Sequence, residues 1–462
     1  MELRSGQRAR CRRVVAVAAM VAASVACARS ASRPAAPANL LLVTLDTLRA
    51  DHVGCYGYPR PTTPSLDRFA ATATRFEDVT CSMPTTLPSH VTIFTGLPPS
   101  LHGVTRNGQI LESYPASIFG LLAQAGARTA AIVSAGVVDS RFVKGLGFDE
   151  VIFDRGGERV FQVNAAVVTD NAVGWLQRHR GERFALWLHY YDPHEPYDPP
   201  AEAAARFTAG YAGALPGALA TEWLVGLNNP GANAALSAAD RQHVVDLYDA
   251  EVAFLDLQLG RVLEVVTELG LEGATLVVIV ADHGQAHGET AFWGHGERLL
   301  EPVIKVPLLV HQPGQRKGRA VPEAVETLDL LPSLLDWFGL PPIAGLPGRS
   351  LAGAASGDAI TPAARRLVER RSYPEQPERA GLAVHRVGEK GTYYREPDGE
   401  VFHIGRAGGE GGLDGENFFA VGDQTSAWFA SEVEHYLARV APGPTGTSAD
   451  DLEMLRALGY VQ

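Results

Sequence analysis

Residues 39–46 read NLLLVTLD, an uninterrupted apolar run that ends on a carboxylate. Such a run, without alternation of polar and apolar residues, is typical of a strand buried on both faces of a sheet. Similar apolar runs recur at 129–134, 184–189, Thr275–Ala281 and 306–311. Helical patterns lie between these runs, at 115–125, 165–178 and 239–269. This alternation of strands and helices predicts an α/β protein with a mostly parallel sheet between two layers of helices.

Length and charge narrow the class of protein. A chain of 462 residues exceeds a usual single core, so we expect one large domain with an appendage. The formal net charge is −12, which argues against nucleic acid or an anionic membrane surface as the main partner. Of the four cysteines, Cys55 and Cys81 lie beyond residue 27, and the sequence leaves open whether they pair.

The first 27 residues predict an export signal. Five arginines precede an uncharged run at 14–26, which is shorter than the roughly 20 residues of a membrane-spanning helix. Small residues end the run and fit cleavage after Ala26, either as an ordinary signal or as a bacterial lipoprotein site with Cys27 acylated. Residues 28–38, rich in Pro and Ala, predict a tether. We therefore expect an exported protein: periplasmic, secreted, or attached to a membrane only through a lipid on Cys27.

Polar residues stand at the ends of three of the predicted strands. Asp46 ends the first, residues 189–194 end the run at 184–189 and include two histidines, and Asp282 and His283 follow the run at Thr275–Ala281. Reactive groups of such sheets gather at the carboxyl ends of the strands, and a buried carboxylate is costly unless it is paired or binds a cation. The pattern predicts one divalent cation, with oxygen ligands favouring Ca²⁺ or Mg²⁺ and the imidazole favouring Mn²⁺ or Zn²⁺. The alternative is a helix cap at Asp46 and a turn histidine at 283.

A third segment, TTLPSH at 85–90, predicts the start of a helix. Pro88 suits a first helical turn and puts Thr86 at the N-terminus. Thr86 then either caps the helix or points its hydroxyl at the cation while free backbone N–H groups hold an anion. A bound cation is the usual means of activating a threonine hydroxyl as a nucleophile.

Together these segments resemble the sulfatase family of the alkaline phosphatase superfamily. The resemblance covers nearly the whole chain, through LDTLRADHVGCYGY, TLPSH, DPHEPY, YDAEVAFLDLQLGRVLEVV, VADHG, WGHGERLLEPVIKVPLLV and LRALGY. It implies an α/β/α sandwich with a large mixed sheet, which we assign to residues 39–345. It also implies a smaller C-terminal subdomain with a short antiparallel sheet and a helix, for which residues 346–462 offer strand-like pieces at Leu382–Arg386 and 391–394 and a polar helix at 425–440.

The resemblance also implies roles for individual residues. Asp46 and Asp282 fall on metal-binding aspartates of the family, and Thr86 occupies the place of the cysteine that sulfatases convert to formylglycine. His194 matches a substrate-contacting histidine, and His295 stands where many sulfatases keep a lysine that contacts the sulfate. We therefore expect both to be catalytic, by neutralising the anion or protonating the leaving group. His90 replaces the arginine that closes the family signature, so we expect it to bind substrate without a permanent charge.

Departures from the family pattern bear on the reaction. Thr47 replaces a paired acid, and His283 replaces the usual Asn. A threonine sulfate ester cannot collapse to an aldehyde as a formylglycine hydrate does, whereas Thr is the nucleophile of superfamily members that act on phosphodiesters. We therefore predict a metal-dependent hydrolase of sulfate or phosphate esters, acting on a small molecule or glycan, with phosphorus chemistry slightly favoured. The alternatives are a phosphoryl-alcohol transferase acting on envelope glycans and an inactive binder of anionic glycans.

Overall fold

The computed structural model describes residues 36–111, 114–157, 160–296, 298–360, 365–369, 382–386, 391–395, 401–406 and 416–420. These residues belong to a unit that spans Pro37–Gln462. The predicted export signal, Cys27, most of the tether and the polar helix expected at 425–440 lie outside the described residues and stay predictions. Within the described part of the chain, no helix combines the length and apolar character of a membrane span.

A sheet of eight strands forms the centre of the fold, in the order β11-β2-β10-β7-β1-β6-β4-β5. Its strands are β1 (Asn39–Leu45), β2 (Thr74–Phe76), β4 (Arg128–Val133), β5 (Glu150–Ile152), β6 (Phe184–Tyr190), β7 (Thr275–Ala281), β10 (Leu308–His311) and β11 (Arg319–Val321). β10 runs antiparallel to both of its neighbours, and the other adjacent strands are parallel. The large, mixed, mostly parallel sheet is thus confirmed, and each predicted apolar run forms one of its strands.

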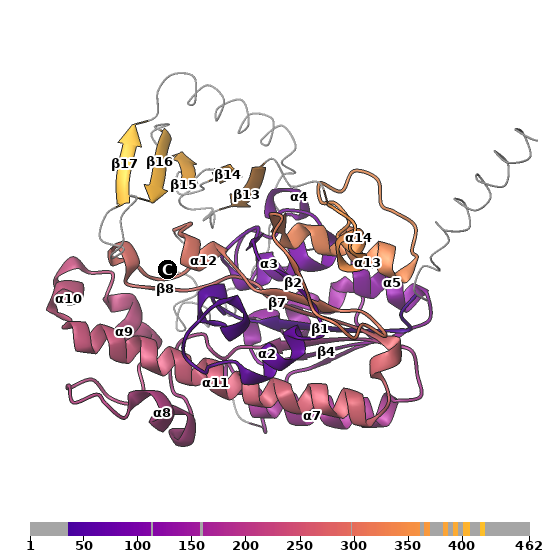
Figure 1. Ribbon diagram of the computed structural model, residues 1–462, viewed down its shortest axis with the longest axis horizontal. Coiled ribbons are helices and arrows are strands. Elements are labelled where there is room, and N and C mark those ends of the chain that lie inside the picture. The colour runs from indigo at the N-terminus through magenta and orange to yellow at the C-terminus, as the bar shows by residue number, and fades with distance from the viewer. Residues whose placement is uncertain are drawn as a thin grey trace, which may run out of the picture. The chain divides into compact units, whose positions relative to one another are not determined.

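Helices cover both faces of this sheet (Figure 1). One layer contains α7 (Ala165–His179) and α11 (Ala238–Glu268), and the other contains α3 (Thr86–Thr95), α5 (Ile118–Gln124) and α13 (Leu330–Phe338). The remaining helices used below are α4 (Pro99–His102), α8 (Ala201–Thr208) and α12 (Glu301–Ile304). Local sequence sets where the long helices begin. A capping box between Ser237 and Asp240 starts α11, and the Asn164 side chain caps α7.

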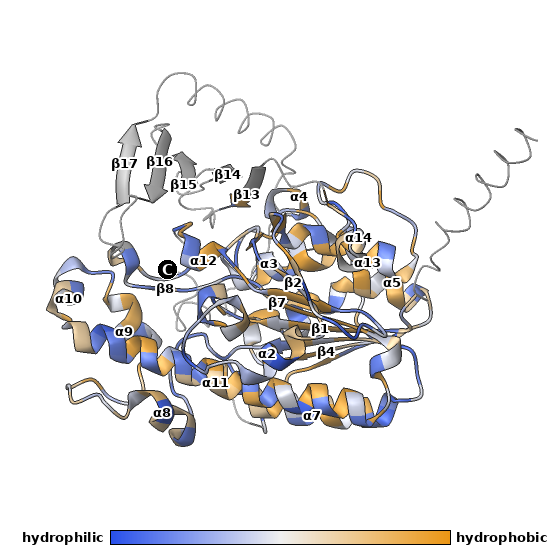
Figure 2. Ribbon diagram, in the orientation of Figure 1, coloured by the Kyte–Doolittle hydropathy of each residue, from blue (hydrophilic) through white to orange (hydrophobic). Residues whose placement is uncertain are grey.

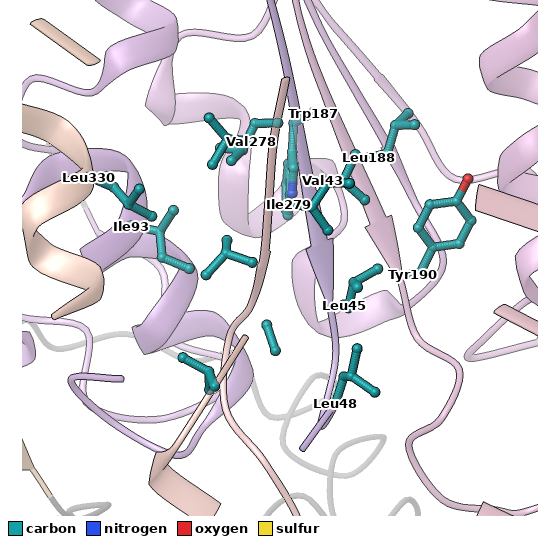
Figure 3. Packing of buried hydrophobic residues seen from close by; sticks show 14 of the residues in the cluster. Val43, Leu45, Leu48, Ile93, Trp187, Leu188, Tyr190, Val278, Ile279 and Leu330 are labelled. Atoms are coloured by element: carbon teal, nitrogen blue, oxygen red, sulfur yellow. The ribbon is translucent and has the colours of Figure 1, made fainter. Parts of the chain in front are cut away.

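Every residue of β1, β6 and β7 is buried. Figure 2 shows the apolar character of the sheet and of the helix faces turned toward it, and Figure 3 shows the packing around Val43, Trp187 and Val278, with Ile93 of α3 beside Leu330 of α13. Burying each such side chain contributes about 1.5–3 kcal/mol. A strand that is buried on both faces leaves only its ends for polar groups, which is why the candidate site lies where these three strands end.

A second, antiparallel sheet is built from β13 (Arg365–Glu369), β14 (Leu382–Arg386), β15 (Gly391–Arg395), β16 (Val401–Arg406) and β17 (Glu416–Ala420), in that order. Two of its strands are the strand-like pieces predicted from the sequence. Glu369 connects β13 to the segments on either side of α3. Its backbone N–H donates to the Ser82 carbonyl (2.7 Å), and its carboxylate accepts from the Ser100 N–H (3.1 Å) and hydroxyl (2.9 Å). Burial raises the pKa of Glu369 to about 7.

Candidate active site

Neighbouring strands bring Asp46, Asp282 and His283 together. β1 lies between β6 and β7, with Leu45 opposite Tyr190 on one side and Ala281 on the other, so the residues that follow meet at one edge. His283 Nε2 lies 3.7 Å from Asp46 Oδ1 and 3.5 Å from Asp282 Oδ2. We call these three fully buried residues the deep cluster. These are the same three residues that the sequence predicts as ion ligands at the ends of the strands.

The backbone turn after β1 is strained, and it positions the deep cluster. Thr47 has a φ of 54°, a left-handed conformation that costs a non-glycine residue about 1–3 kcal/mol. Its N–H donates to Asp282 Oδ1 (3.3 Å), and the Tyr248 hydroxyl of α11 donates to its carbonyl (2.8 Å). The same hydroxyl accepts from the Arg49 N–H (3.0 Å). These bonds fix the strained turn, and the turn brings the Asp46 and Asp282 carboxylates close together.

The atoms that face one another in the deep cluster lack protein partners. Both carboxylate oxygens of Asp46, Oδ2 of Asp282 and Nε2 of His283 are buried and make no hydrogen bond to any described residue. Burial, and then the charge of Glu195, raises the pKa of Asp46; burial, and then Asp46, raises that of Asp282. Burial also lowers the pKa of His283, which keeps its imidazole neutral. Two carboxylates and a neutral imidazole with unsatisfied lone pairs fit a divalent cation.

Two further buried groups lie beside the deep cluster, and the sequence did not single them out as site residues. His189 Nε2 is 3.4 Å from Asp46 Oδ2 and has no hydrogen-bond partner among the described residues, and burial lowers its pKa to about 3. The Thr47 hydroxyl is also buried without a described partner. His189 lies within β6, opposite Thr44 of β1. A histidine inside an otherwise apolar strand was the signal that could have identified it.

Thr86 is the first residue of α3, as Pro88 predicted, and is fully buried. Its hydroxyl makes no hydrogen bond of ordinary geometry within the described chain, yet it lies close enough to Asp46 to oppose part of the rise in that pKa. The Ser89 hydroxyl donates to the Asp282 carbonyl (2.7 Å) and fastens α3 to the end of β7. The proposed nucleophile therefore stands next to the deep cluster.

The first turn of α3 offers fewer backbone donors than we expected. The Leu87 N–H donates to Asn107 Oδ1 (2.8 Å), the Ser89 N–H donates to the Thr85 carbonyl (3.0 Å), and Pro88 has no N–H. Of the three N–H groups of residues 86–89, that of Thr86 remains. The expectation that several free N–H groups hold an anion here is therefore wrong, because a loop side chain and a helix-start bond already use them.

His90 follows Thr86 by one helical turn, and its ring is fully buried beneath the site. Its Nδ1–H donates to the Thr86 carbonyl (2.7 Å), and its Nε2 accepts from the Thr44 hydroxyl (2.8 Å). Burial, and then His189, lowers the pKa of His90, so the ring is neutral. Both ring nitrogens bind protein groups, which leaves none for a substrate. The predicted substrate-binding role is thus corrected: His90 positions Thr86.

His194 and His295 form a second cluster beside the first, which we call the histidine pair. Their Nε2 atoms are 3.0 Å apart, and the His295 ring lies 4.4 Å from that of His283. His194 Nδ1 lies 2.6 Å from the Glu195 carbonyl, so Nδ1 carries a proton, and burial lowers the pKa of His194 to about 3. The proton between the two Nε2 atoms therefore belongs to His295. The Nδ1 atom of His295 lies 3.2 Å from the Pro84 carbonyl.

Comparisons with known proteins agree with this fold. A family model described as "Sulfatase" matches residues 38–340. The chain is similar to an arylsulfatase of Clostridium perfringens, with 23% identity over 372 residues that cover 65% of this chain and 74% of that protein. It is also similar to the N-sulphoglucosamine sulphohydrolase of Homo sapiens, with 28% identity over 338 residues that cover 66% of this chain and 62% of the relative. A solved phosphonate monoester hydrolase of Agrobacterium radiobacter has the same fold, with a TM-score of 0.68, 19% identity and coverage of 87% and 95% of the two chains.

Proposed function

Because the chain belongs to the sulfatase family and is a hydrolase of ester bonds, we propose that it cleaves sulfate or phosphate esters with Thr86 as the nucleophile. One observation carries this proposal. The Thr86 hydroxyl is buried at the start of α3, beside Asp46, and makes no hydrogen bond of ordinary geometry with any described group. A threonine that merely capped the helix would accept a backbone N–H, and no such bond is made here.

We propose that Asp46, Asp282 and His283 hold one divalent ion, Ca²⁺, Mg²⁺, Mn²⁺ or Zn²⁺. The unpartnered carboxylate oxygens and imidazole nitrogen of the deep cluster support this assignment. A divalent ion bound there would lower the pKa of the Thr86 hydroxyl and neutralise charge on the ester. His189 and the Thr47 hydroxyl are close enough to this cluster to complete the surroundings of the ion.

The histidine pair supplies the proton chemistry of the proposed reaction. The Thr86 oxygen loses its proton and attacks the phosphorus or sulfur atom in line, and the bond to the leaving alcohol breaks. His295, whose Nε2–H donates to His194 before the reaction, gives that proton to the leaving alcohol, and the proton released by Thr86 restores His295. Water then attacks phosphorus or sulfur, the bond to Thr86 breaks, and the proton that the water loses returns to the Thr86 oxygen, because a threonine ester has no aldehyde form to collapse to.

The substrate we propose is a sulfated or phosphorylated small molecule or glycan. The names of the relatives support an anionic ester, and the phosphonate monoester hydrolase with the same fold is compatible with chemistry at phosphorus. We further propose that residues 1–27 direct export, to the periplasm or out of the cell, either with a lipid on Cys27 or without one. Membrane fractionation of the Cys27→Ser chain tests the lipid, since the variant would leave the membrane fraction if Cys27 is acylated.

The reaction is tested with the wild-type chain and its Thr86→Ala, Thr86→Ser and Thr85→Ala variants. Each would be treated with chelator, resupplied with Ca²⁺, Mn²⁺ or Zn²⁺, and offered an aryl sulfate, an aryl phosphodiester and an aryl phosphonate. Thr85 is a matched control, because it lies one residue away and its hydroxyl is also buried without a described partner. We expect Thr86→Ala to abolish turnover, Thr86→Ser to retain part of it and Thr85→Ala to retain most.

The other possible outcomes of this experiment distinguish the alternative functions. Unchanged turnover by Thr86→Ala would exclude Thr86 as the nucleophile, and turnover of the sulfate alone would contradict the preference for phosphorus. Products coupled to an added alcohol such as glycerol would identify a transferase. A chain that binds sulfated glycans before and after the Thr86→Ala change, and turns over no ester with any ion, would be an inactive binder.

A further inference from the structure

A cavity of about 810 Å³ lies beside the histidine pair and is not used by the proposed reaction. Its wall includes His194 and Tyr191 after β6, residues of α8, and Glu251 of α11, and Figure 1 shows α8 lying along α11. Three of its lining residues are acids, namely Asp192, Asp198 and Glu251, and none is Lys or Arg. An anionic ester group would be repelled here, so the cavity suits a different part of the substrate.

One carboxylate oxygen of this cavity lacks a partner. Asp192 is 7% exposed, and its Oδ2 is buried without a hydrogen bond to any described residue. Glu251 is 5% exposed and accepts the Asp198 N–H (2.7 Å), and it lines the same cavity as Asp192 and Asp198. Burial raises the pKa of Asp192 to about 7, and burial together with Asp192 raises that of Glu251. Buried acids that repel one another are stabilised by a cation that donates hydrogen bonds to both.

Size and remaining lining suggest what carries that cation. The volume is within the range of small-molecule sites, and Tyr191, Pro196 and Pro199 give part of the wall an apolar surface against which a ring can pack. A primary ammonium has three donors for the oxygens of Asp192 and Glu251. A neutral hydroxyl could donate one hydrogen bond but would not offset the repulsion between the two carboxylates.

We propose that this cavity is a substrate subsite that binds a protonated primary amine, such as that of an amino sugar, while the ester lies at Thr86. The proposal rests on the function proposed above, because it assigns the cavity to the same substrate. It makes Asp192 and Glu251 determinants of specificity. Neither residue contacts the reacting atoms.

The test is the binding of sugars that carry no ester. Calorimetry or ligand-detected NMR on the full chain would compare glucosamine, N-acetylglucosamine and glucose, at a pH at which the glucosamine amine is protonated. A hydrogen-bonded charge pair predicts that glucosamine binds about tenfold or more tightly than the other two sugars. Asp192→Asn and Glu251→Gln should each remove this preference, and both keep a hydrogen-bonding group of the same shape.

The control is Asp170→Asn in α7, an exposed acid paired with Arg261 outside the cavity, which should keep the preference for glucosamine. Equal affinity of the wild-type chain for the three sugars, no binding of any of them, or a preference that survives both cavity variants would overturn the proposal. Since these sugars need no hydrolysis, a chain that prefers glucosamine but cleaves no ester would contradict the proposed function and leave the subsite standing.

Discussion

The deep cluster and the histidine pair adjoin each other but are built differently. Each member of the deep cluster directly follows a central strand and is fully buried. The histidine pair joins two loops that are 101 residues apart, and His295 is partly exposed. Strand ends hold atoms at fixed distances, as a bound ion requires, whereas loops can differ between relatives and adapt to the substrate. This difference is the basis on which we propose ion binding for the first group and proton transfer for the second.

The largest expected effect is that of breaking the deep cluster. Asp46→Asn should lower kcat/KM by about 10³-fold or more, because it removes a carboxylate next to both Thr86 and His283. The same variant should lose bound metal when the protein is analysed by elemental analysis after dialysis. Turnover within tenfold of wild type, with full metal content, would contradict the assignment of Asp46 as a ligand.

Breaking the histidine pair should cost less and leave the metal in place. His295→Ala should reduce kcat by about 10²-fold, the usual worth of a general acid, with unchanged metal content. The loss should be smaller for nitrophenyl esters, whose leaving group needs little protonation, than for alkyl esters. His179→Ala on α7, a histidine paired with Glu182 at the surface, is the matched control. Metal loss in His295→Ala would show that the two groups are one ion site.

Removing the metal tests the difference between the deep cluster and the histidine pair through the stability of the folded protein. Chelation should lower the free energy of unfolding by about 2.7 kcal/mol when the ion is present at roughly 100 times its Kd, because the ion binds the folded chain and not the unfolded one. Thermal unfolding with and without chelator measures this difference. The shift should be retained in His194→Ala and largely lost in Asp46→Asn; an equal shift in both variants would remove the distinction between the two groups.

The smallest effect is expected when His90, which is hydrogen-bonded to the Thr86 carbonyl, is replaced. His90→Phe leaves the Thr86 carbonyl and the Thr44 hydroxyl without their imidazole partner, which should destabilise the protein by about 1–3 kcal/mol. Because the ring does not reach the substrate, kcat should fall while KM stays unchanged. Steady-state kinetics separate the two parameters. An increase in KM alone would restore the substrate-binding role that the structure removes.

The two groups also differ in how far the sequence predicted them. Asp46 and Asp282 are recognisable because an apolar run ends on each, and Pro88 located the start of α3. The roles expected for His194 and His295 came from family resemblance, since loop residues carry no periodicity that places them in space. His189 was missed because it lies inside an apolar strand. The role of His90 was wrong because a sequence does not say whether a helical histidine faces the site or the core.

The hydrogen bonds of Glu369 limit how this enzyme can be truncated or joined to parts of a relative. Its bonds reach Ser82 and Ser100, which stand before and after the helix that begins with Thr86. A chain ending near residue 345 would lose these bonds and leave both segments to solvent. The C-terminal strands are therefore not a removable addition, and a chimaera that exchanged them with a relative would have to bring an equivalent acid to this position.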